Sequence, residues 1–326
     1  MSVNLTVSAA PHIRGKDNTR RLMLDVLIAL APALIAAVYF YGERALVLTV
    51  ISVAACVVCE ALICLVMRRP VSVGDLSAVV TGVLLAFSVP HSCPYWALVA
   101  GDAFAIIVVK GLVGGLGQNV FNPALAGRAF MMLLWPSTIT RYGYTYVAPF
   151  EFGTADIVAS STPLQTMARS TLPDVSIFDM FLGNGVLGCI GEVCNLALLI
   201  GLAWLLYRKV ISWRIPVAYL GAVAVLTLVF SKGDNALAWM LYSVLGGGVM
   251  LGAIFMATDY ATSPTLPVAQ LVYGIGCGVL TVVIRYFGIF PEGVTYAILI
   301  MNACAWAFDK AFPIRRFGVV KGGAGK

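Results

Sequence analysis

A polar interval in an otherwise apolar sequence holds the side chains best suited to chemistry. Between Trp135-Pro136 and Ile177 the chain carries Ser, Thr, Tyr, Asp and Pro, and no apolar run there is long enough to cross a bilayer. Within this interval, Asp156–Leu164 reads Asp-Ile-Val-Ala-Ser-Ser-Thr-Pro-Leu. We expect the chemistry of the protein in this stretch, with the apolar remainder as its scaffold.

A second candidate stretch, Gly114–Phe130, combines a Gly-rich turn, an Asn-Pro helix start and an arginine inside an apolar helix. Glycines let backbone amides converge on an anion, and Asn122 before Pro123 is typical of an N-cap with proline at the first helical position. The P-loop pattern is absent. Close helix packing by small residues explains the glycines equally well. Arg128 nevertheless favours a functional role, because a guanidinium in lipid needs an anionic partner or a polar cavity.

Other ionisable residues lie within or at the ends of the apolar runs, and charge inside a membrane indicates function by default. These residues are Asp25, Glu60, Asp102, Lys110, Glu192, Asp259, Glu292 and Asp309. Asp25 and Asp309 lie near helix ends and are predicted to be interfacial. The candidate ion path comprises Asp102, Glu60, Glu192 and Asp259. Pairing of these acids with Lys110 or Arg128 is the alternative, and the sequence alone does not pair them.

The composition is that of an integral membrane protein. Apolar residues make up 60% and charged residues 11% of the chain, against about 25% charged in soluble proteins, and the mean hydropathy is +0.94. Met1–Lys16 is polar and basic, so we expect no cleavable signal peptide and a retained first helix. The net charge of +6 comes from basic residues in short loops, which is the positive-inside pattern and argues against nucleic-acid binding. Cys56-x-x-Cys59 and Cys64 lie in an apolar run, where packing explains them better than a metal site.

Ten apolar runs near the length needed to cross hydrocarbon predict an all-α, multi-pass fold. They are Leu22–Tyr41, Ala45–Val66, Leu76–Val89, Tyr95–Val113, Pro123–Trp135, Leu187–Tyr207, Trp213–Phe230, Leu237–Met256, Val268–Phe287 and Val294–Phe312. The third and fifth are short, which indicates tilted, half-buried or broken helices. We expect a single membrane domain in which residues 22–135 and 187–312 form five helices each.

The charge distribution predicts the orientation of these helices. Fourteen Lys and Arg residues fall on the N-terminal side of the membrane and five on the other, so the tails 1–21 and 313–326 are predicted to be cytoplasmic. The loop 136–186 then lies outside. Gly and Pro residues occur at similar positions in the two halves, and each half has five predicted helices. This pattern favours an inverted 5+5 repeat. The alternative is that the two halves acquired these residues independently.

Three motifs together resemble one known family. They are Gly117-Gln-Asn-Val-Phe-Asn-Pro-Ala-Leu-Ala-Gly-Arg-Ala-Phe130, Phe255-Met-Ala-Thr-Asp259 with Thr262-Ser-Pro264, and Phe290-Pro-Glu-Gly-Val-Thr-Tyr-Ala-Ile-Leu-Ile-Met-Asn302. The sequence is similar to the family of the D subunit of the Rnf ferredoxin:NAD oxidoreductase and its homologue, the B subunit of the sodium-translocating NADH:quinone reductase. The resemblance extends from Pro11 to Phe317, and the absence of a long N-terminal extension favours the Rnf type.

The resemblance implies an FMN attached by a phosphoester bond to a threonine in an outer loop. A flavin transferase attaches it by reading Asp-x-x-Ser/Thr-Gly-Ala-Thr. Here Asp156 and Thr162 have the right separation, followed by Pro-Leu as in the family. Ala159 replaces the usual hydroxyl residue and Ser160-Ser161 replaces Gly-Ala, so both serines are rival acceptors. Arg128 and Asn122 complete the residues assigned to the cofactor, and Arg141 and Arg169 are candidates to neutralise its phosphate.

The same resemblance implies a function. The chain is expected to be a flavoprotein subunit of an ion-translocating electron-transport complex in the cytoplasmic membrane of a bacterium or archaeon. It would couple ferredoxin:NAD chemistry to Na⁺ or H⁺ movement, together with partner subunits, and a non-covalent riboflavin is a further candidate cofactor. Two alternatives stay open: a secondary transporter or channel without a redox group, and a non-redox membrane anchor for partner subunits.

Overall fold

The computed structural model describes residues 18–69, 72–112, 117, 119–140, 142–145, 157–159, 162–233, 235–288 and 292–312. Asp156, Ser160, Ser161 and Arg141 lie outside the described residues, as do both predicted tails apart from Asn18–Arg21. For 143–145 and 157–159 only the backbone is considered. Thr162, Arg128, Asn122 and all four residues of the candidate ion path are described.

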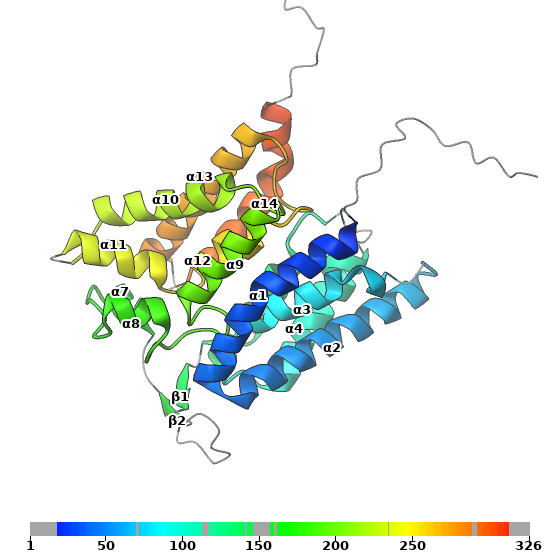
Figure 1. Cartoon of the computed structure of the whole chain (residues 1–326), viewed down its shortest axis with the longest axis horizontal. Coiled ribbons are helices and arrows are strands. Elements are labelled where there is room, and N and C mark those ends of the chain that lie inside the picture. The colour runs from blue at the N-terminus through cyan, green and yellow to red at the C-terminus, as the bar shows by residue number, and fades with distance from the viewer. Residues whose placement is uncertain are drawn as a thin grey trace, which may run out of the picture.

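Helices form at each of the ten apolar runs. The first half contains α1 (Thr19–Tyr41), α2 (Glu43–Val66), α3 (Ser77–Phe87), α4 (Tyr95–Ala103) continued by the π-helical segment η2 (Phe104–Leu112), and α5 (Pro123–Leu134). The second half contains α9 (Asn195–Tyr207), α10 (Arg214–Val229), α11 (Ala236–Leu245), α12 (Val249–Leu251) continued by the π-helical η3 (Gly252–Met256), α13 (Pro267–Phe287) and α14 (Val294–Ala311). In Figure 1 the blue and cyan helices of the first half form one side of the molecule, and the helices of the second half form the other.

The polar interval has more local structure than a loop. It contains α6 (Pro136–Ile139), strands β1 (Gly143–Thr145) and β2 (Ile157–Ala159), α7 (Pro163–Ala168) and α8 (Ile177–Leu182). The strands pair antiparallel with Tyr144 opposite Val158. Figure 1 shows α7, α8, β1 and β2 at the lower left of the molecule. A further short helix, η1 (Val73–Asp75), precedes α3. The predicted all-α class is therefore confirmed, with one pair of three-residue strands in the polar interval.

The prediction of ten spans is not confirmed. By length and apolar composition, four helical segments in the described part of the chain can cross a membrane, and a fifth is counted if the bent pair α11 and α12–η3 forms one span. The four are Thr19–Tyr41, Glu43–Val66, Tyr95–Leu112 and Pro267–Phe287. Helices α3, α5, α9 and α10 are apolar but shorter. Helix α3 is buried at nearly every residue. Because protein encloses it, its length need not match the hydrocarbon thickness.

The predicted span Leu187–Tyr207 begins too early, because its helix starts at Asn195. The segment before it is irregular and pairs with the end of α3. Ile190 N donates to Val89 O at 3.0 Å, and Gly191 N donates to Phe87 O at 2.9 Å. A helix leaves its last carbonyl groups without intrahelical partners. The irregular segment satisfies them, which places Glu192 beside the end of α3.

The predicted span Leu237–Met256 is bent, since α11 and α12–η3 meet at an angle of 60° as a broken span or a re-entrant loop. The break falls at Gly246-Gly247-Gly248. Gly247 has φ +67°, a conformation that side chains other than glycine rarely adopt. The sharp bend therefore has a local cause in the glycine run, and it leaves backbone groups in the interior free to bind side chains.

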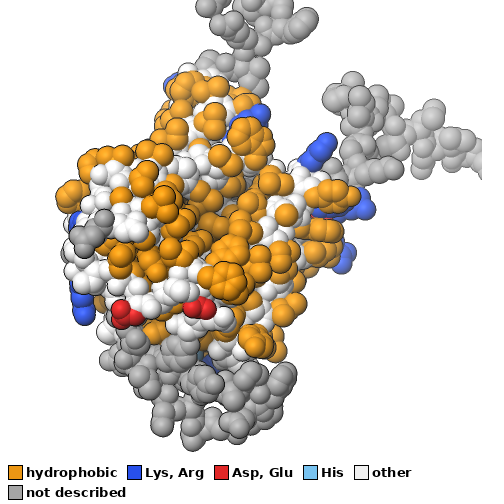
Figure 2. Space-filling model, turned by 60° about the vertical axis from the view of Figure 1, so that its left-hand side comes forward, with side chains coloured by type: hydrophobic (Ala, Val, Ile, Leu, Met, Phe, Trp, Pro, Cys, Tyr) orange, Lys and Arg blue, Asp and Glu red, His pale blue; other side chains and the backbone are white. Residues whose placement is uncertain are grey.

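The two halves share a packing scheme. Helix α2 packs against α3 and α4, and α10 packs against α11 and α13. Helix α4 packs on α5, and α13 packs on α14, while α1 with α9 and α5 with α14 join the halves. The inverted repeat itself stays a prediction. Hydrophobic side chains cover much of the face in Figure 2, and the Lys and Arg side chains in view lie towards its margins, as expected for a membrane protein.

Candidate functional site

Thr162 is the N-cap of α7. Its Oγ1 accepts a hydrogen bond from Gln165 N at 3.2 Å, and its own N–H donates to Gln165 Oε1 at 3.1 Å. This reciprocal capping box, with Pro163 at the first helical position, is a strong helix-start signal. Thr162 is only 7% exposed. The tertiary fold therefore holds this hydroxyl in one place at a protected helix start.

Thr162 lines a pocket that we call the threonine pocket. Its lining includes Thr162, Tyr142, Leu164, Met180, Glu192, Gly246, Gly247 and Glu292. A larger cavity of about 510 Å³ shares Tyr142 and Glu292 with it, and we call this the arginine cavity. Arg169, Arg285 and Gln165 are among the residues that line the arginine cavity. Its volume lies within the range of about 300–1,000 Å³ typical of sites for small molecules.

Arg128 of α5 forms a buried ion pair with Glu292, which precedes α14. Nη1 donates to Glu292 Oε1 at 3.2 Å, and Nη2 donates to Oε2 in a still shorter contact. Gly248 N at the break also donates to Glu292 Oε1, at 3.1 Å. Arg128 is 3% and Glu292 7% exposed. Of the two surroundings expected for Arg128, an anionic partner or a polar cavity, the structure shows the anionic partner, and the two-pronged geometry is the strongest form of this pair.

Glu192 and Cys189 complete the cluster around Arg128. Glu192 Oε1 accepts from Cys189 N at 2.6 Å, whereas its Oε2 has no hydrogen-bond partner among the described residues. Ligand atoms of Cys189, Glu192 and Glu292 lie within 4.8 Å of one another, a spacing that suits a metal ion. Arg128 Nη2 lies 3.5 Å from Cys189 Sγ. The guanidinium of Arg128 thus places a positive charge beside these ligand atoms, as a bound metal ion would.

A second arginine, Arg285 of α13, binds the broken end of α11. Nη1 donates to Ser243 O at 2.6 Å, and Nη2 donates to Gly246 O at 3.0 Å. Cations near the last carbonyls of a helix are stabilising. The glycine break is therefore held open by Arg285 on its carbonyl side and by Glu292 on its amide side. Both side chains line the arginine cavity.

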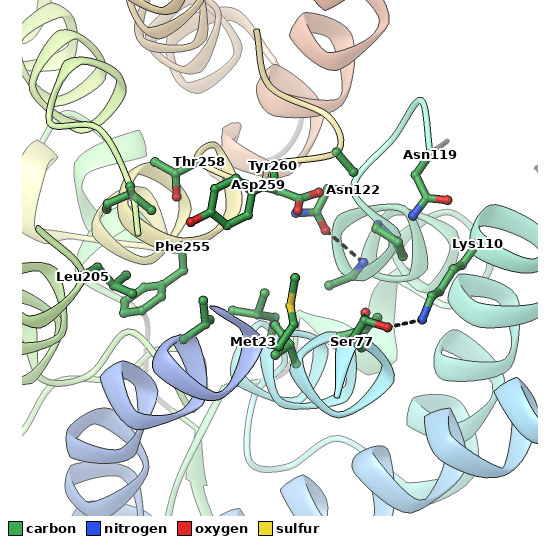
Figure 3. Close-up of a pocket in the computed structure, with 18 residues that line it drawn as sticks. Met23, Ser77, Lys110, Asn119, Asn122, Leu205, Phe255, Thr258, Asp259 and Tyr260 are labelled. Carbon is green, nitrogen blue, oxygen red and sulfur yellow. Dashed lines mark hydrogen bonds between the residues drawn. The ribbon is translucent and has the colours of Figure 1, made fainter. Parts of the chain in front are cut away.

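A separate pocket lies around Asn122, and we call it the asparagine pocket (Figure 3). Asn122 Oδ1 accepts from Ala124 N at 3.0 Å and from Leu125 N at 3.3 Å, so the predicted N-cap of α5 is confirmed. Its Nδ2 donates to Met256 O at 3.2 Å, at the end of η3. Asn122 therefore joins the start of α5 to the other half of the protein. It lines a different pocket from Thr162.

Lys110 and Glu60 form an ion pair beside the asparagine pocket. Lys110 Nζ donates to Glu60 Oε1 and to Ser77 Oγ, both at 2.6 Å. Ser72 Oγ donates to the same Glu60 oxygen at 2.7 Å. Lys110 is 4% and Glu60 2% exposed. Ser77 in turn donates to Asp75 Oδ1 at 2.5 Å, so a chain of hydrogen bonds connects buried Glu60 to the partly exposed η1.

Asp102 lies in the same interface between α2 and α4, and it is fully buried. Ser52 Oγ lies 2.7 Å and Cys56 Sγ 3.3 Å from Asp102 Oδ1. Ser52 Oγ also lies 2.8 Å from Gly82 O. One hydroxyl proton serves only one of these acceptors. If Asp102 Oδ1 carries a proton, it can donate to Ser52 Oγ while Ser52 donates to Gly82 O. Cys56 Sγ contacts the same carboxyl group, so Cys56 has a polar contact in addition to the packing expected from the sequence.

The remaining acidic residues have structural partners. Asp25 forms an ion pair with Arg208 at 3.1 Å, and Asp309 accepts from Thr265 N at 3.2 Å. Asp259 lies in the turn after η3 and lines the asparagine pocket. Burial raises the pKa of the Asp259 carboxyl, and the hydrogen bond from Thr262 opposes that rise.

The structure divides the predicted site residues between two pockets. Thr162 and Glu192 line the threonine pocket, and Arg128 is hydrogen-bonded to Glu292, which also lines it. Asn122 and Asp259 line the asparagine pocket. Lys110 lines it as well and forms an ion pair with Glu60. Sequence reasoning did not assign Cys189, Tyr142, Glu292, Lys110 or Arg285 to a site. For Glu292 the signal was available, because a buried arginine requires an acid and Glu292 lies in a motif with Pro and Gly.

Comparison with known proteins identifies the family that the three sequence motifs resemble. The chain matches the NQR2, RnfD, RnfE family over residues 6–318. It is 47% identical to the D subunit of a Na⁺-translocating ferredoxin:NAD⁺ oxidoreductase complex from Acetobacterium woodii, covering 98% of this chain and 97% of that one. It is 35% identical to the D subunit of a proton-translocating complex of the same kind from Clostridium ljungdahlii, covering 96% of each chain. The chain therefore belongs to the NQR2, RnfD, RnfE family.

Proposed function

We propose that this chain is the D-type subunit of an ion-translocating ferredoxin:NAD oxidoreductase complex and relays electrons through FMN esterified to Thr162. Two relatives named as subunits of such complexes are similar along nearly their whole length, which supports the assignment to a complex. Partner subunits would then handle ferredoxin and NAD, and a flavin transferase would attach the FMN.

The observation that carries the FMN proposal is the position of Thr162. Its side chain lines the threonine pocket, next to the arginine cavity. Arg169 would bind the phosphate oxygens there, and Arg285, whose terminal nitrogens bind Ser243 O and Gly246 O, would add positive charge nearby. Gln165 would hold Thr162 through the capping box. FMN supplies the electron-transfer chemistry when bound, and the chain anchors, orients and shields it.

Riboflavin, the second cofactor implied by the resemblance, is proposed as a non-covalent ligand. The asparagine pocket offers amide and hydroxyl groups from Asn119, Asn122, Ser77, Thr258 and Tyr260. Its volume is about 60 Å³, far below the range of about 300–1,000 Å³ for sites that hold such molecules. Binding there would require the pocket to widen.

We further propose that both termini are cytoplasmic, that the interval with Thr162 faces outward and that the complex moves Na⁺ or H⁺. The asymmetry of basic residues supports the orientation. The buried acids Glu60 and Asp102 support ion movement, because carboxyl groups inside a membrane commonly mark ion or proton paths.

Flavin fluorescence in a denaturing gel tests the FMN attachment. The chain is expressed with its transferase as the wild type, Thr162→Ala, Thr162→Ser and Ser161→Ala. We expect fluorescence in the wild type and in Ser161→Ala, and none in Thr162→Ala. Mass analysis of the fragment spanning 157–169 locates the added group. A dark wild-type band would contradict the redox role and favour a transporter, whereas unchanged electron flow in Thr162→Ala complexes would favour a membrane anchor.

A further inference from the structure

The ammonium of Lys110 contacts oxygen atoms of the kinds that bind small cations. Its ammonium contacts Glu60 Oε1 and Ser77 Oγ at 2.6 Å, and Ser72 Oγ lies 2.7 Å from the same Glu60 oxygen. Carboxylate and hydroxyl oxygens are also the ligands that hard metal cations use. Glu60 Oε2 is buried and finds no hydrogen-bond partner in the part of the chain that the structure describes. Ligand oxygens and an open coordination position are therefore both present around the ammonium.

A second buried acceptor lines the same pocket as Lys110. Asn119 is 6% exposed, and its Oδ1 is buried without a hydrogen-bond donor among the residues with a described position. Lys110, Asn119 and Asp259 all line the asparagine pocket, as Figure 3 shows. A buried acceptor without a donor is costly. The pocket thus offers the flexible ammonium an amide oxygen and a carboxylate as alternative partners.

We propose that Lys110 is an internal switch that alternates with the transported monovalent cation at Glu60. When a proton or Na⁺ occupies Glu60, the ammonium moves to Asn119 Oδ1 and Asp259 in the asparagine pocket. When the cation leaves, the ammonium returns. One positive charge replaces another, so the buried carboxylate stays compensated throughout. This is necessary because an unpaired charge in the interior is strongly destabilising.

The hydrogen-bonded chain to Asp75 gives the switch an entrance. Ser77 contacts both Lys110 Nζ and Asp75 Oδ1, and Asp75 lies at the partly exposed η1. A cation that arrives at Asp75 meets Ser77 Oγ and then the position of the Lys110 ammonium, which contacts Glu60 Oε1. On the far side, Cys56, Ala78 and Ile106 form an apolar cluster. Cys56 of this cluster contacts Asp102 Oδ1 through its Sγ at 3.3 Å, so the hydrogen-bonded chain from Glu60 leads towards η1 and the apolar cluster adjoins Asp102.

This inference rests on the proposed ion translocation, and cation uptake by the complete complex in sealed vesicles tests it. Na⁺ and H⁺ uptake are measured separately, together with ferredoxin:NAD turnover. Lys110→Met removes the competing ammonium, and we expect the KM for the transported cation to fall by about tenfold or more, equivalent to about 1.4 kcal/mol. The ratio of cations moved to electrons transferred should also fall. Arg208→Met, which breaks the separate pair with Asp25, should leave both quantities unchanged.

Two further variants keep the test decisive if Lys110→Met fails to assemble. Asn119→Leu keeps the ion pair but removes an alternative partner of Lys110, so the KM for the cation should rise several-fold. The charge-balanced double variant Lys110→Met/Glu60→Gln should assemble and move no cation. A wild-type KM in Asn119→Leu, or normal uptake in the double variant, would overturn the switch. No cation uptake by the wild-type complex would instead contradict the proposed function.

Discussion

The buried pair of Arg128 and Glu292 makes a testable contribution to the stability of the site. Arg128→Met removes two charge-assisted hydrogen bonds to Glu292 and the contact with Cys189 Sγ. Each bond to a charged group contributes about 1.5–3 kcal/mol. Among the described residues, Glu292 then keeps Gly248 N as its one hydrogen-bond donor, and it is 7% exposed. We expect a loss of about 3–5 kcal/mol, the usual cost of breaking one side of a buried ion pair.

A double-mutant cycle measures the part of this cost that belongs to the pair. The four proteins are the wild type, Arg128→Met, Glu292→Leu and the double variant, compared by unfolding in detergent. The double variant removes both charges, so it should be more stable than the sum of the single effects predicts, with a coupling of about 2–3 kcal/mol. Exposed Arg20→Met is the surface control and should change the stability by less than about 0.5 kcal/mol.

Two outcomes would refute this reasoning. If Arg128→Met were as mild as Arg20→Met, the guanidinium would not be a buried charge that needs compensation. If the single effects simply added, the two side chains would be stabilised by other partners. A large coupling together with the loss of flavin in the single variants would further connect the pair to the threonine pocket that Glu292 lines.

Two further predictions concern packing and helix capping. A Cβ at Gly82 would lie 2.8 Å from Val53 Cα, so Gly82→Val should separate α2 from α3 and destabilise the protein by about 1–3 kcal/mol. Thermal unfolding in detergent checks this, and Gly221→Ala, where the added Cβ meets nothing within 4 Å, is the control. Asn122→Ala removes the N-cap of α5 and the bond to Met256 O, and we expect a loss of about 1–2 kcal/mol. An unchanged unfolding temperature for Asn122→Ala would show that the join between the halves at Asn122 is not stabilising.

Sequence periodicity located the helices well but not their continuity. All ten apolar runs contain helix, because apolar residues in lipid or in a buried core require satisfied backbone groups. The irregular start of Leu187–Tyr207 was missed, since its amides pair with carbonyls at the end of α3, more than ninety residues away. The bend at Gly246–Gly248 had a local signal, three consecutive glycines, which an apolar-run count does not weigh.

The sequence by itself determined the class of environment, the helix start at Asn122, and the need of Arg128 for an anionic partner or a polar cavity. Those features depend on composition and on neighbours a few residues apart. Only the tertiary structure decided that the acid is Glu292, that Lys110 belongs to Glu60, and that Asn122 and Thr162 line separate pockets. The partners in the first ion pair are 164 residues apart and those in the second 50. Charge pairing in a low-dielectric interior depends on distance in space, which is set by how the helices pack.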